Sequence, residues 1–329
     1  MQTRQNVLHQ WLEKTYPAIP FTLTPLSGDA SFRRYFRLEI NHQKWMVMDA
    51  PPEKEPLSPF ITICKILREH SIHAPAIEKV EFDLGFAILE DFGDVLLLKK
   101  LQPTNADYFY KKAMDILLQI QACPTASIPA FNAAYMEGEL SLFKDWFLEK
   151  YLSLNLNGKD KDLLDQYFSH LITTINAQPK TFIHRDYHSR NLMIIHEAPL
   201  ELGVIDFQDA MWGPITYDLV SLLKDCYIQW PRQQTLEWVN YFYSHLDIPL
   251  SPEEFIKAFD YCGLQRHLKV LGIFCRLHFR DNKSSYLKDL PLVFNYVMAC
   301  LETYAELNPL LRLMQDQIYP AFLEKRRLL

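Results

Sequence analysis

Apolar positions in the first part of the chain follow the spacing of two helices and of paired strands. In residues 4–15 they form one helical stripe, and a second helix is predicted over 58–70. The stripe comprises Val7, Leu8, Trp11 and Leu12. Residues 21–50 predict strands, with a hairpin of 32–40 and 44–50, and residues 76–82 and 85–91 predict a second strand pair. This region therefore predicts a small antiparallel sheet with two helices.

From residue 94 onward the pattern is mostly helical. The predicted helices are 94–122, 137–154, 160–177, 214–229, 232–246, 251–280, 285–304 and 307–326. Short strands at 181–183, 192–195 and 202–207 interrupt this run, with a hairpin turn at 196–199. The fold class expected is α+β, with two lobes that meet near Phe92-Gly93. The smaller lobe is 1–92 and the larger, helical lobe is 93–329.

Composition narrows the class of protein. The 329 residues are 49% hydrophobic and 22% charged, and the formal net charge is −6, which argues against nucleic-acid binding across the whole surface. No apolar stretch reaches membrane-spanning length, and no apolar signal region follows the N-terminus. Six scattered cysteines without a C-x-x-C motif are typical of reduced thiols. We therefore expect a cytoplasmic protein, with no membrane association and no evident obligate protein partner.

One polar segment carries the candidate chemistry. His184, Asp186 and Asn191 form the pattern H-x-D-x-x-x-x-N, and Asp206-Phe207 follows after the next strand pair. This is the layout of a kinase catalytic loop with its metal-binding Asp downstream. It predicts phosphoryl transfer in a two-lobed, protein-kinase-like fold. The alternative is an ordinary polar loop in which Asp186 and Asn191 cap turns.

The spacing suggests a role for each of these residues. Asn191 begins one strand and Asp206 ends its expected partner, so both side chains can converge on one Mg²⁺ ion. Asp186 lies upstream, where it can accept the proton of an attacking hydroxyl. His184 is expected to brace the loop.

The nucleotide is expected in the 1–92 lobe. Between the first two strands, the backbone amides and hydroxyls around Ser27, Gly28 and Ser31 can cradle phosphate, although an ordinary turn is an equal interpretation. Arg33 and Arg37 share one face of the next strand and can supply positive charge. Their alternative interpretation is a pair of solvated arginines on an edge strand.

The usual phosphate-pairing Lys is missing. Met48 stands at roughly the position where a protein kinase has it, and no Glu partner is evident on the following helix. Glu90-Asp91-Phe92-Gly93 contains the letters DFG, but it precedes the catalytic loop and is not the metal motif. Backbone groups of Glu90 to Phe92 instead suit a hinge that binds adenine. The alternative is a turn followed by a helix capped by Asp94.

The acceptor is expected to be a small molecule. Only a short segment separates Asp206 from Gly213-Pro214, which we expect to open the next helix, so a polypeptide-binding activation segment is absent. On the helix over 264–280, four basic residues fall within an arc of about 80°. They are Arg266, Lys269, Arg276 and Arg280. This stripe favours an anionic acceptor, and a solvated helix face is the alternative.

A second helix of the larger lobe offers further candidates. Glu139 and Trp146 are seven residues apart and share a helical face. Trp146 can stack on a sugar ring, although core packing is the more common role for such a residue.

The segments around these residues resemble the aminoglycoside phosphotransferase and choline kinase-like superfamily. The resemblance covers nearly the whole chain and rests on 183–192, 204–210 and 213–219. Three narrower segments, 28–35, 47–53 and 265–274, resemble the anomeric N-acetylmuramate/N-acetylglucosamine kinases of cell-wall (peptidoglycan) recycling. The missing strand Lys is shared with that subgroup.

The resemblance implies ATP, Mg²⁺ and phosphorylation of the sugar at its C1 hydroxyl. It implies that Asp186 is the catalytic base, that Asn191 and Asp206 bind the metal, and that Asp218 braces the loop. His188 and Arg190 either contact substrate or phosphate or brace the loop. The substrate candidates are therefore His188, Arg190, Glu139, Arg266, Lys269 and Arg276.

Two other functions stay open. One is a kinase of the same fold that acts on an aminoglycoside, choline or another small alcohol. The other is a pseudokinase that serves as a binding module, which the missing strand Lys would suit. The sequence also leaves open which of the two amino sugars is preferred and which basic residue replaces the strand Lys.

Overall fold

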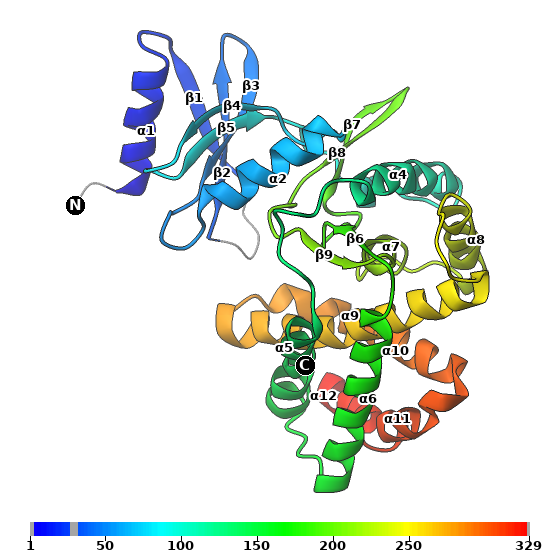
Figure 1. Cartoon of the computed structure of the whole chain (residues 1–329). Coiled ribbons are helices and arrows are strands. Elements are labelled where there is room, and N and C mark those ends of the chain that lie inside the picture. Colours follow the sequence, from blue (N-terminus) through cyan, green and yellow to red (C-terminus); the bar gives the residue numbers. More distant parts are fainter. Residues whose placement is uncertain (1–2, 27–31, 328–329) are drawn as a thin grey trace. The chain divides into compact units, whose positions relative to one another are not determined.

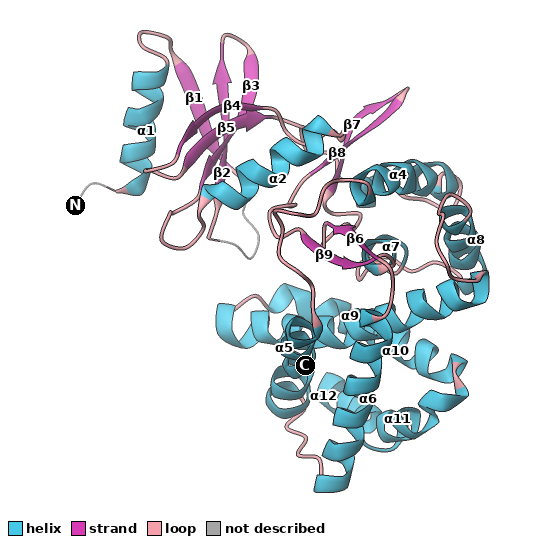
Figure 2. Ribbon diagram, in the orientation of Figure 1, coloured by secondary structure: helices cyan, strands magenta, loops and turns pink. Residues whose placement is uncertain are grey.

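The computed structural model describes residues 3–26 and 32–327 of the chain (Figure 1). It has the expected α+β composition, with a small antiparallel sheet and a mainly helical remainder (Figure 2). Contacts divide the chain into two units. The first is Met1–Leu96 with Asn191–Asp209, and the second is Leu97–Arg190 with Ala210–Leu329. The predicted domain boundary at 92/93 stays a prediction. It assigns residues 191–209 to the larger lobe, whereas the contacts group them with the first unit.

The first unit is built on a five-stranded antiparallel sheet in the order β1-β2-β3-β5-β4. Its strands are β1 (Phe21–Pro25), β2 (Arg34–Ile40), β3 (Gln43–Asp49), β4 (Ile77–Glu81) and β5 (Phe86–Glu90). The β2–β3 hairpin confirms the predicted one. Asn41 and His42 turn it with φ of 50° and 64°, which matches the twist of paired strands.

Two helices accompany this sheet, α1 (Arg4–Thr15) and α2 (Leu57–Glu69). The stripe on α1 predicted from the sequence is confirmed, since Leu8, Trp11 and Leu12 are buried in one cluster with Phe36 and Val47 of the sheet. Burial of such side chains contributes about 1.5–3 kcal/mol each. The α1 helix is therefore held by its apolar stripe, which covers one face of the sheet.

A separate hairpin completes the first unit. It consists of β7 (Leu192–Glu197) and β8 (Leu200–Val204), and its backbone is tied to the rest of the unit by hydrogen bonds from Ile194 N to Val95 O and from Val204 N to His73 O. The strand pair was predicted, but the expected strand over 202–207 ends earlier. Asp206 lies in the loop beyond β8, with φ of 65°.

The second unit is mainly helical. Its longer helices are α4 (Ala106–Gln121), α5 (Ala133–Leu142), α6 (Gly158–Asn176), α7 (Tyr217–Leu223), α8 (Arg232–Tyr243), α9 (Pro252–Asp281), α10 (Leu290–Thr303) and α12 (Tyr319–Arg327). Its shorter ones are α3 (Leu97–Lys100), α11 (Asn308–Leu313), η2 (Ser284–Asp289) and η3 (Ala305–Leu307), with π-helical η1 (Phe143–Tyr151) and η4 (Met314–Ile318). Several predicted long helices are thus divided. Pro103 lies between α3 and α4, and Pro291 lies in the first turn of α10, after η2. Proline lacks the N–H that an interior turn requires.

A small two-stranded sheet precedes α7. The strand β6 (Lys180–Ile183) pairs with β9 (Met211–Pro214) in an antiparallel register. The prediction that Gly213-Pro214 opens a helix is therefore wrong, because these residues end a strand and the helix begins at Tyr217. Gly213 has no room for a side chain, since a Cβ there would lie 2.4 Å from Ile183 Cδ1.

The α9 helix runs through the second unit and packs against α5, α7 and α10 (Figure 1). A capping box between Ser251 and Glu254 begins it, and Asn282 ends it in the left-handed conformation. At Gly272 the helices approach closely, because a Cβ would lie 2.3 Å from the carbonyl oxygen of Leu142. Within residues 3–26 and 32–327, no helix is both long and apolar enough to cross a membrane.

Candidate active site

Buried carboxylates hold the segment 184–190 in the second unit. Asp218, fully buried on α7, accepts hydrogen bonds from His184 N at 2.6 Å and Arg185 N at 2.9 Å. Burial raises the pKa of Asp218 to about 7, although these backbone amides lower it. Asp225 accepts from both the backbone and the hydroxyl of Ser189. These contacts fix the backbone on both sides of Asp186, and Asp218 has the bracing position expected of it.

Asp186 combines exposure with a cationic neighbour. Its side chain is 41% exposed, and its Oδ1 lies 3.5 Å from Nη2 of Arg266, which is almost fully buried. Partial burial raises the pKa of Asp186, but Arg266, Lys269, His188 and Arg185 lower it more, so the pKa lies well below its ordinary value. The carboxylate is therefore ionised at neutral pH and accessible to an acceptor.

Glu139 and Lys269 form a buried ion pair. Lys269 Nζ lies 2.7 Å from Glu139 Oε1, and Gln265 donates to Oε2 at 3.0 Å. Both charged side chains are about 7% exposed. The alternative that this part of the basic stripe is a solvated helix face is therefore wrong for Arg266 and Lys269. Their charges lie inside the unit, on the side of α9 that faces the 184–190 segment and α5.

The remaining substrate candidates lie nearer the surface. The His188 ring meets Tyr227 edge to face at 5.6 Å, and the Arg190 guanidinium lies 4.6 Å from the centre of the same Tyr227 ring. The structure thus groups His188 and Arg190, and their roles stay predictions. Arg276 is half-buried, and burial together with Arg280 lowers its pKa.

Trp146 lies on the π-helical segment η1 and is half-buried. The predicted face shared by Glu139 and Trp146 assumed a period of 3.6 residues through 137–154. The π-helical winding from Phe143 breaks that period. The prediction of one continuous α-helical face is therefore wrong, because the register changes between the two residues.

The metal-binding candidates lie together in the first unit. Asn191 Nδ2 donates to Asp206 Oδ2 at 3.3 Å, and Gln208 Nε2 donates to Asp206 Oδ1 at 2.8 Å. Ile205 N also donates to Asn191 O at 3.1 Å, which ties the two segments at the backbone. An exposed carboxylate beside an amide is a hard-oxygen donor set, and it fits Mg²⁺ bound jointly by protein and phosphate oxygens.

A second ion pair lies near Asp206. Arg33 Nη2 is 2.9 Å from Glu55 Oε2, just before α2. Burial raises the pKa of Tyr35 to about 12; Arg33 lowers it, whereas Asp206 and Glu55 raise it. The charges of Arg33, Glu55 and Asp206 therefore all act on the ionisation of Tyr35. The predicted phosphate-loop residues Ser27, Gly28 and Ser31 lie outside the described residues.

Arg37, the second arginine predicted to supply positive charge to the phosphates, has carboxylate partners. Arg37 contacts the carboxylates of Asp91 and Asp94, so it fixes the segment after β5. The alternative of solvated arginines is therefore wrong for Arg37, which is 19% exposed. Asp94 does not cap a helix, since α3 begins only at Leu97. Asp91, the Asp of the letters DFG, is engaged by Arg37 as well.

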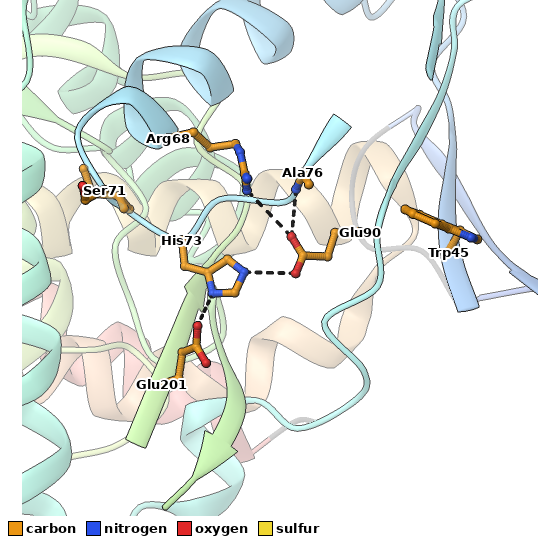
Figure 3. A pocket seen from close by; sticks show the side chains of 8 residues that line it. Trp45, Arg68, Ser71, His73, Ala76, Glu90 and Glu201 are labelled. Atoms are coloured by element: carbon orange, nitrogen blue, oxygen red, sulfur yellow. Dashed lines mark hydrogen bonds and ion pairs between the residues drawn. The ribbon is translucent and has the colours of Figure 1, made fainter. Parts of the chain in front are cut away.

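The side chain of Glu90 faces an open pocket of about 590 Å³ within the first unit. His73 bridges two carboxylates there, with Nε2 at 3.1 Å from Glu90 and Nδ1 at 2.7 Å from Glu201 (Figure 3). Glu90 also accepts from Ala76 N, and Arg68 lies 3.8 Å away. The pocket's charged groups thus pair with one another and connect α2, β5 and β8. This engages the Glu90 side chain, and the Glu90 N–H donates to Ala76 O at 2.8 Å. The hinge role predicted for the backbone of Glu90 to Phe92 stays a prediction.

Phe92 packs tightly in the same region. Its ring meets His73 edge to face at 4.9 Å. A Cβ on Gly203 of β8 would lie 2.5 Å from the Phe92 ring. The segment after β5 is therefore held by Phe92 on one side and by the Arg37 ion pairs on the other.

Sequence reasoning missed three participants: Glu55, Arg185 and Asp225. Glu55 and Asp225 are ordinary acidic residues whose partners lie far away in the chain. The sequence signal for Arg185 is its place between His184 and Asp186, inside the motif.

Comparison with known proteins places this geometry in a family. The model of the "Phosphotransferase enzyme family" matches residues 22–249. An N-acetylmuramate/N-acetylglucosamine kinase of Pseudomonas aeruginosa is 38% identical over 323 residues, covering 93% of this chain and 95% of that protein. The enzyme of that name from Neisseria meningitidis is 37% identical over 326 residues and covers 96% of each chain.

Solved structures agree on the fold. A choline/ethanolamine kinase family protein from Mesorhizobium loti has a TM-score of 0.64 at 12% identity, with coverage of 93% of this chain and 97% of the other. An ADP-bound aminoglycoside phosphotransferase has a TM-score of 0.58 at 15% identity, with coverage of 88% and 97%. The predicted protein-kinase-like fold is thereby confirmed, and the chain belongs to the phosphotransferase enzyme family.

Proposed function

We propose that this protein is an ATP-dependent kinase that phosphorylates the anomeric C1 hydroxyl of N-acetylmuramate and N-acetylglucosamine, as in peptidoglycan recycling. The observation that carries the proposal is the state of Asp186. Its carboxylate is ionised, partly exposed and held beside the buried Arg266. The similarity to two amino-sugar kinases over nearly the whole chain supports the choice of acceptor.

Asp186 acts as the base in this mechanism. It orients the acceptor hydroxyl and takes its proton as the γ-phosphoryl group is transferred. An anomeric hydroxyl is more acidic than an ordinary alcohol, so a carboxylate with a depressed pKa remains an adequate base. Arg266 keeps that carboxylate in place, and it also donates to the carbonyl of Arg185 at 3.0 Å. Catalysis then rests mainly on positioning and electrostatics.

Asn191 and Asp206 are the proposed Mg²⁺ ligands. Their proximity and hard oxygen atoms suit this ion. When bound, Mg²⁺ neutralises charge on the leaving diphosphate. Gln208 holds the Asp206 carboxylate from its other side, so the oxygen donors are fixed before the nucleotide binds.

Arg33 is our candidate for the cation that replaces the strand Lys. A protein kinase pairs its strand Lys with a Glu of the following helix, and here Arg33 pairs with Glu55 at 2.9 Å. Met48, at the usual Lys position, is fully buried. Ser27, Gly28 and Ser31 are proposed to add backbone and hydroxyl donors to the phosphates, and the backbone from Glu90 to Phe92 to bind adenine.

The charge of the acceptor region argues against the rival acceptors. Aminoglycosides and choline are cations, and Arg266, Lys269 and Arg185 would repel them. The pseudokinase alternative is disfavoured by the presence of Asp186, Asn191 and Asp206 together.

Release of ADP tests the proposal directly. Purified protein with ATP and Mg²⁺ is offered N-acetylmuramate, N-acetylglucosamine, an aminoglycoside or choline, and phosphorus NMR locates the new phosphate. We expect turnover of the amino sugars with an anomeric phosphate product, and Asp186→Asn should lower kcat by about 10²–10⁴-fold. Turnover of only the cationic acceptors would refute the proposal. Equal ATP consumption by wild type and Asp186→Asn would refute the assigned base.

A further inference from the structure

The backbone of Arg185 has a conformation that favours glycine. Its φ is +76°, in the left-handed region that a residue with a Cβ adopts only at a cost in free energy. Asp218 holds the Arg185 N–H at 2.9 Å, and Arg266 donates to its carbonyl at 3.0 Å. These two hydrogen bonds hold the backbone of Arg185 in this conformation. The residue has a long cationic side chain and directly precedes Asp186.

The Arg185 side chain extends toward α5. Nη2 lies 3.4 Å from Glu139 Oε1, and the guanidinium lies 5.0 Å from the centre of the Tyr135 ring. Tyr135 is 38% exposed, and the Arg185 side chain is 14% exposed. The guanidinium therefore lies over a partly exposed aromatic ring, and the exposed part of the Arg185 side chain is open to a ligand in solution.

Glu139 is already matched by another cation. Lys269 is closer to it, at 2.7 Å, than Arg185 is. Among the described side chains of this cluster, Arg185, Arg266 and Lys269 are cationic, whereas Glu139 and Asp186 are carboxylates. Burial lowers the pKa of Arg185, but Tyr217, Asp186 and Glu139 raise it more, so all three cations are charged. Asp218, which accepts from the Arg185 backbone, is only partly ionised at neutral pH because burial raises its pKa to about 7. A fraction of one positive charge therefore stays unbalanced in the cluster, and an anionic ligand would balance it.

We propose that Arg185 is a specificity residue that selects an acceptor bearing a carboxylate. The inference rests on the proposed amino-sugar kinase activity. N-acetylmuramate carries a lactyl carboxylate, whereas N-acetylglucosamine lacks it. The planar guanidinium fork matches a carboxylate with two parallel hydrogen bonds. Arg185 directly precedes Asp186, the proposed base, and its guanidinium lies over the Tyr135 ring. It is therefore placed to contact the acceptor and not the nucleotide.

The kinetic test compares the two sugars in wild type, Arg185→Gly and Arg185→Gln. Both variants remove the guanidinium, and we expect KM for N-acetylmuramate to rise about tenfold to a hundredfold more than KM for N-acetylglucosamine. The value of kcat should fall equally with both sugars, because Arg185 also lowers the pKa of Asp186. Glycine suits the left-handed backbone, so Arg185→Gly should melt at a temperature no lower than Arg185→Gln. This comparison separates loss of the contact from loss of the fold.

Two further variants complete the experiment. Arg185→Lys keeps the charge without the fork, and we expect it to recover part of the preference for N-acetylmuramate. Arg312→Gln, which removes an exposed arginine on α11, should leave both sugars unaffected. An equal rise in KM for both sugars, or no rise for either, would overturn the role of Arg185 while leaving the kinase activity intact. If wild type phosphorylates neither sugar, the proposed function fails and this inference fails with it.

Discussion

Arg266 contacts Asp186 and the carbonyl of Arg185 with the same guanidinium. Nη2 lies 3.5 Å from the carboxylate, and Nη1 lies 3.0 Å from the carbonyl oxygen. The Arg266 side chain is only 5% exposed, whereas Asp186 is 41% exposed. A buried cation on α9 thus holds an accessible carboxylate on the loop, and it affects both the position of that carboxylate and its ionisation.

Arg266→Gln should make catalysis more sensitive to acid. Arg266 is the cation that lowers the pKa of Asp186 most, against the enclosure that raises it. In wild type the folded-state pKa is depressed, so the ionised base persists well below neutral pH. Without Arg266 the pKa rises, and the base is lost at a higher pH as acid is added. The measurement is kcat against pH, with a loss of about tenfold or more at neutral pH and an acidic limb that moves upward.

The Arg312→Gln variant, on the surface of α11, controls for the change in net charge. Parallel pH profiles for Arg266→Gln and wild type, differing only in height, would contradict the effect on ionisation. They would leave Arg266 a purely structural role in the loop.

Arg33→Gln should weaken nucleotide binding if Arg33 replaces the strand Lys. We expect KM for ATP to rise by about tenfold or more, as loss of a charge-assisted hydrogen bond predicts, while KM for the sugar changes little. Glu55→Gln should have a smaller effect in the same direction, because it removes only the negative charge that orients Arg33.

Arg34→Gln is the matched control for Arg33. Arg34 is the adjacent residue, but it pairs with the buried Asp49, which Arg4 also contacts. Its loss should leave KM for ATP within about twofold. A larger effect from Arg34 than from Arg33 would show that another cation serves the phosphates.

Asp206→Asn should raise the Mg²⁺ concentration needed for half-maximal activity by about tenfold or more, because a carboxylate is a much stronger ligand for this ion than an amide. Binding of ATP, measured by calorimetry with and without Mg²⁺, gives a readout that does not depend on turnover. The variant should bind ATP with little dependence on Mg²⁺. Asp209→Asn, an exposed carboxylate on the same loop, is the control, and an equal effect there would count against Asp206.

Local patterns predicted much of the first unit. The α1 stripe and the β2–β3 hairpin were correct because each depends on spacing within a short segment. The β9 strand was missed because its pairing with β6 joins residues about thirty positions apart. The π-helical turn of η1 was missed for a different reason, since periodicity calculations assume one helical period throughout.

In the candidate site, too, the sequence predicts features that depend on a short segment and misses those that depend on distant contacts. The motif located Asp186, Asn191 and Asp206, but not the residues that support them. Glu139 and Lys269 lie 130 positions apart in the chain and form an ion pair where α9 packs against α5. Gly272 leaves room for the close approach of α9 to the end of α5. No local pattern reveals such a pair. The basic stripe on α9 was visible in the sequence, but its burial against α5 and the catalytic loop was not.

The fold should lose stability in mild acid because of His267. This histidine is 1% exposed, stacks on Tyr296 at 4.7 Å and bonds the carbonyl of Lys224 at 2.9 Å. Burial, with smaller contributions from the charges of Lys224 and Arg266, lowers its pKa to about 3, although the backbone hydrogen bond raises it. The folded-state pKa is thus below the unfolded value of about 6.5. The unfolded chain binds the proton between these values, so stability is full above pH 6.5 and falls as the pH drops toward 3.

His267→Gln should remove this dependence while keeping a donor for the Lys224 carbonyl. Between pH 7.5 and 5.5 wild type should lose about 1.4 kcal/mol of unfolding free energy through His267, and the variant should lack that component. Urea denaturation at the two pH values measures the difference. His278→Gln, on an exposed part of the same helix, should keep the wild-type dependence. If His267→Gln lost as much stability as wild type over this interval, the acid sensitivity would have to arise from other groups.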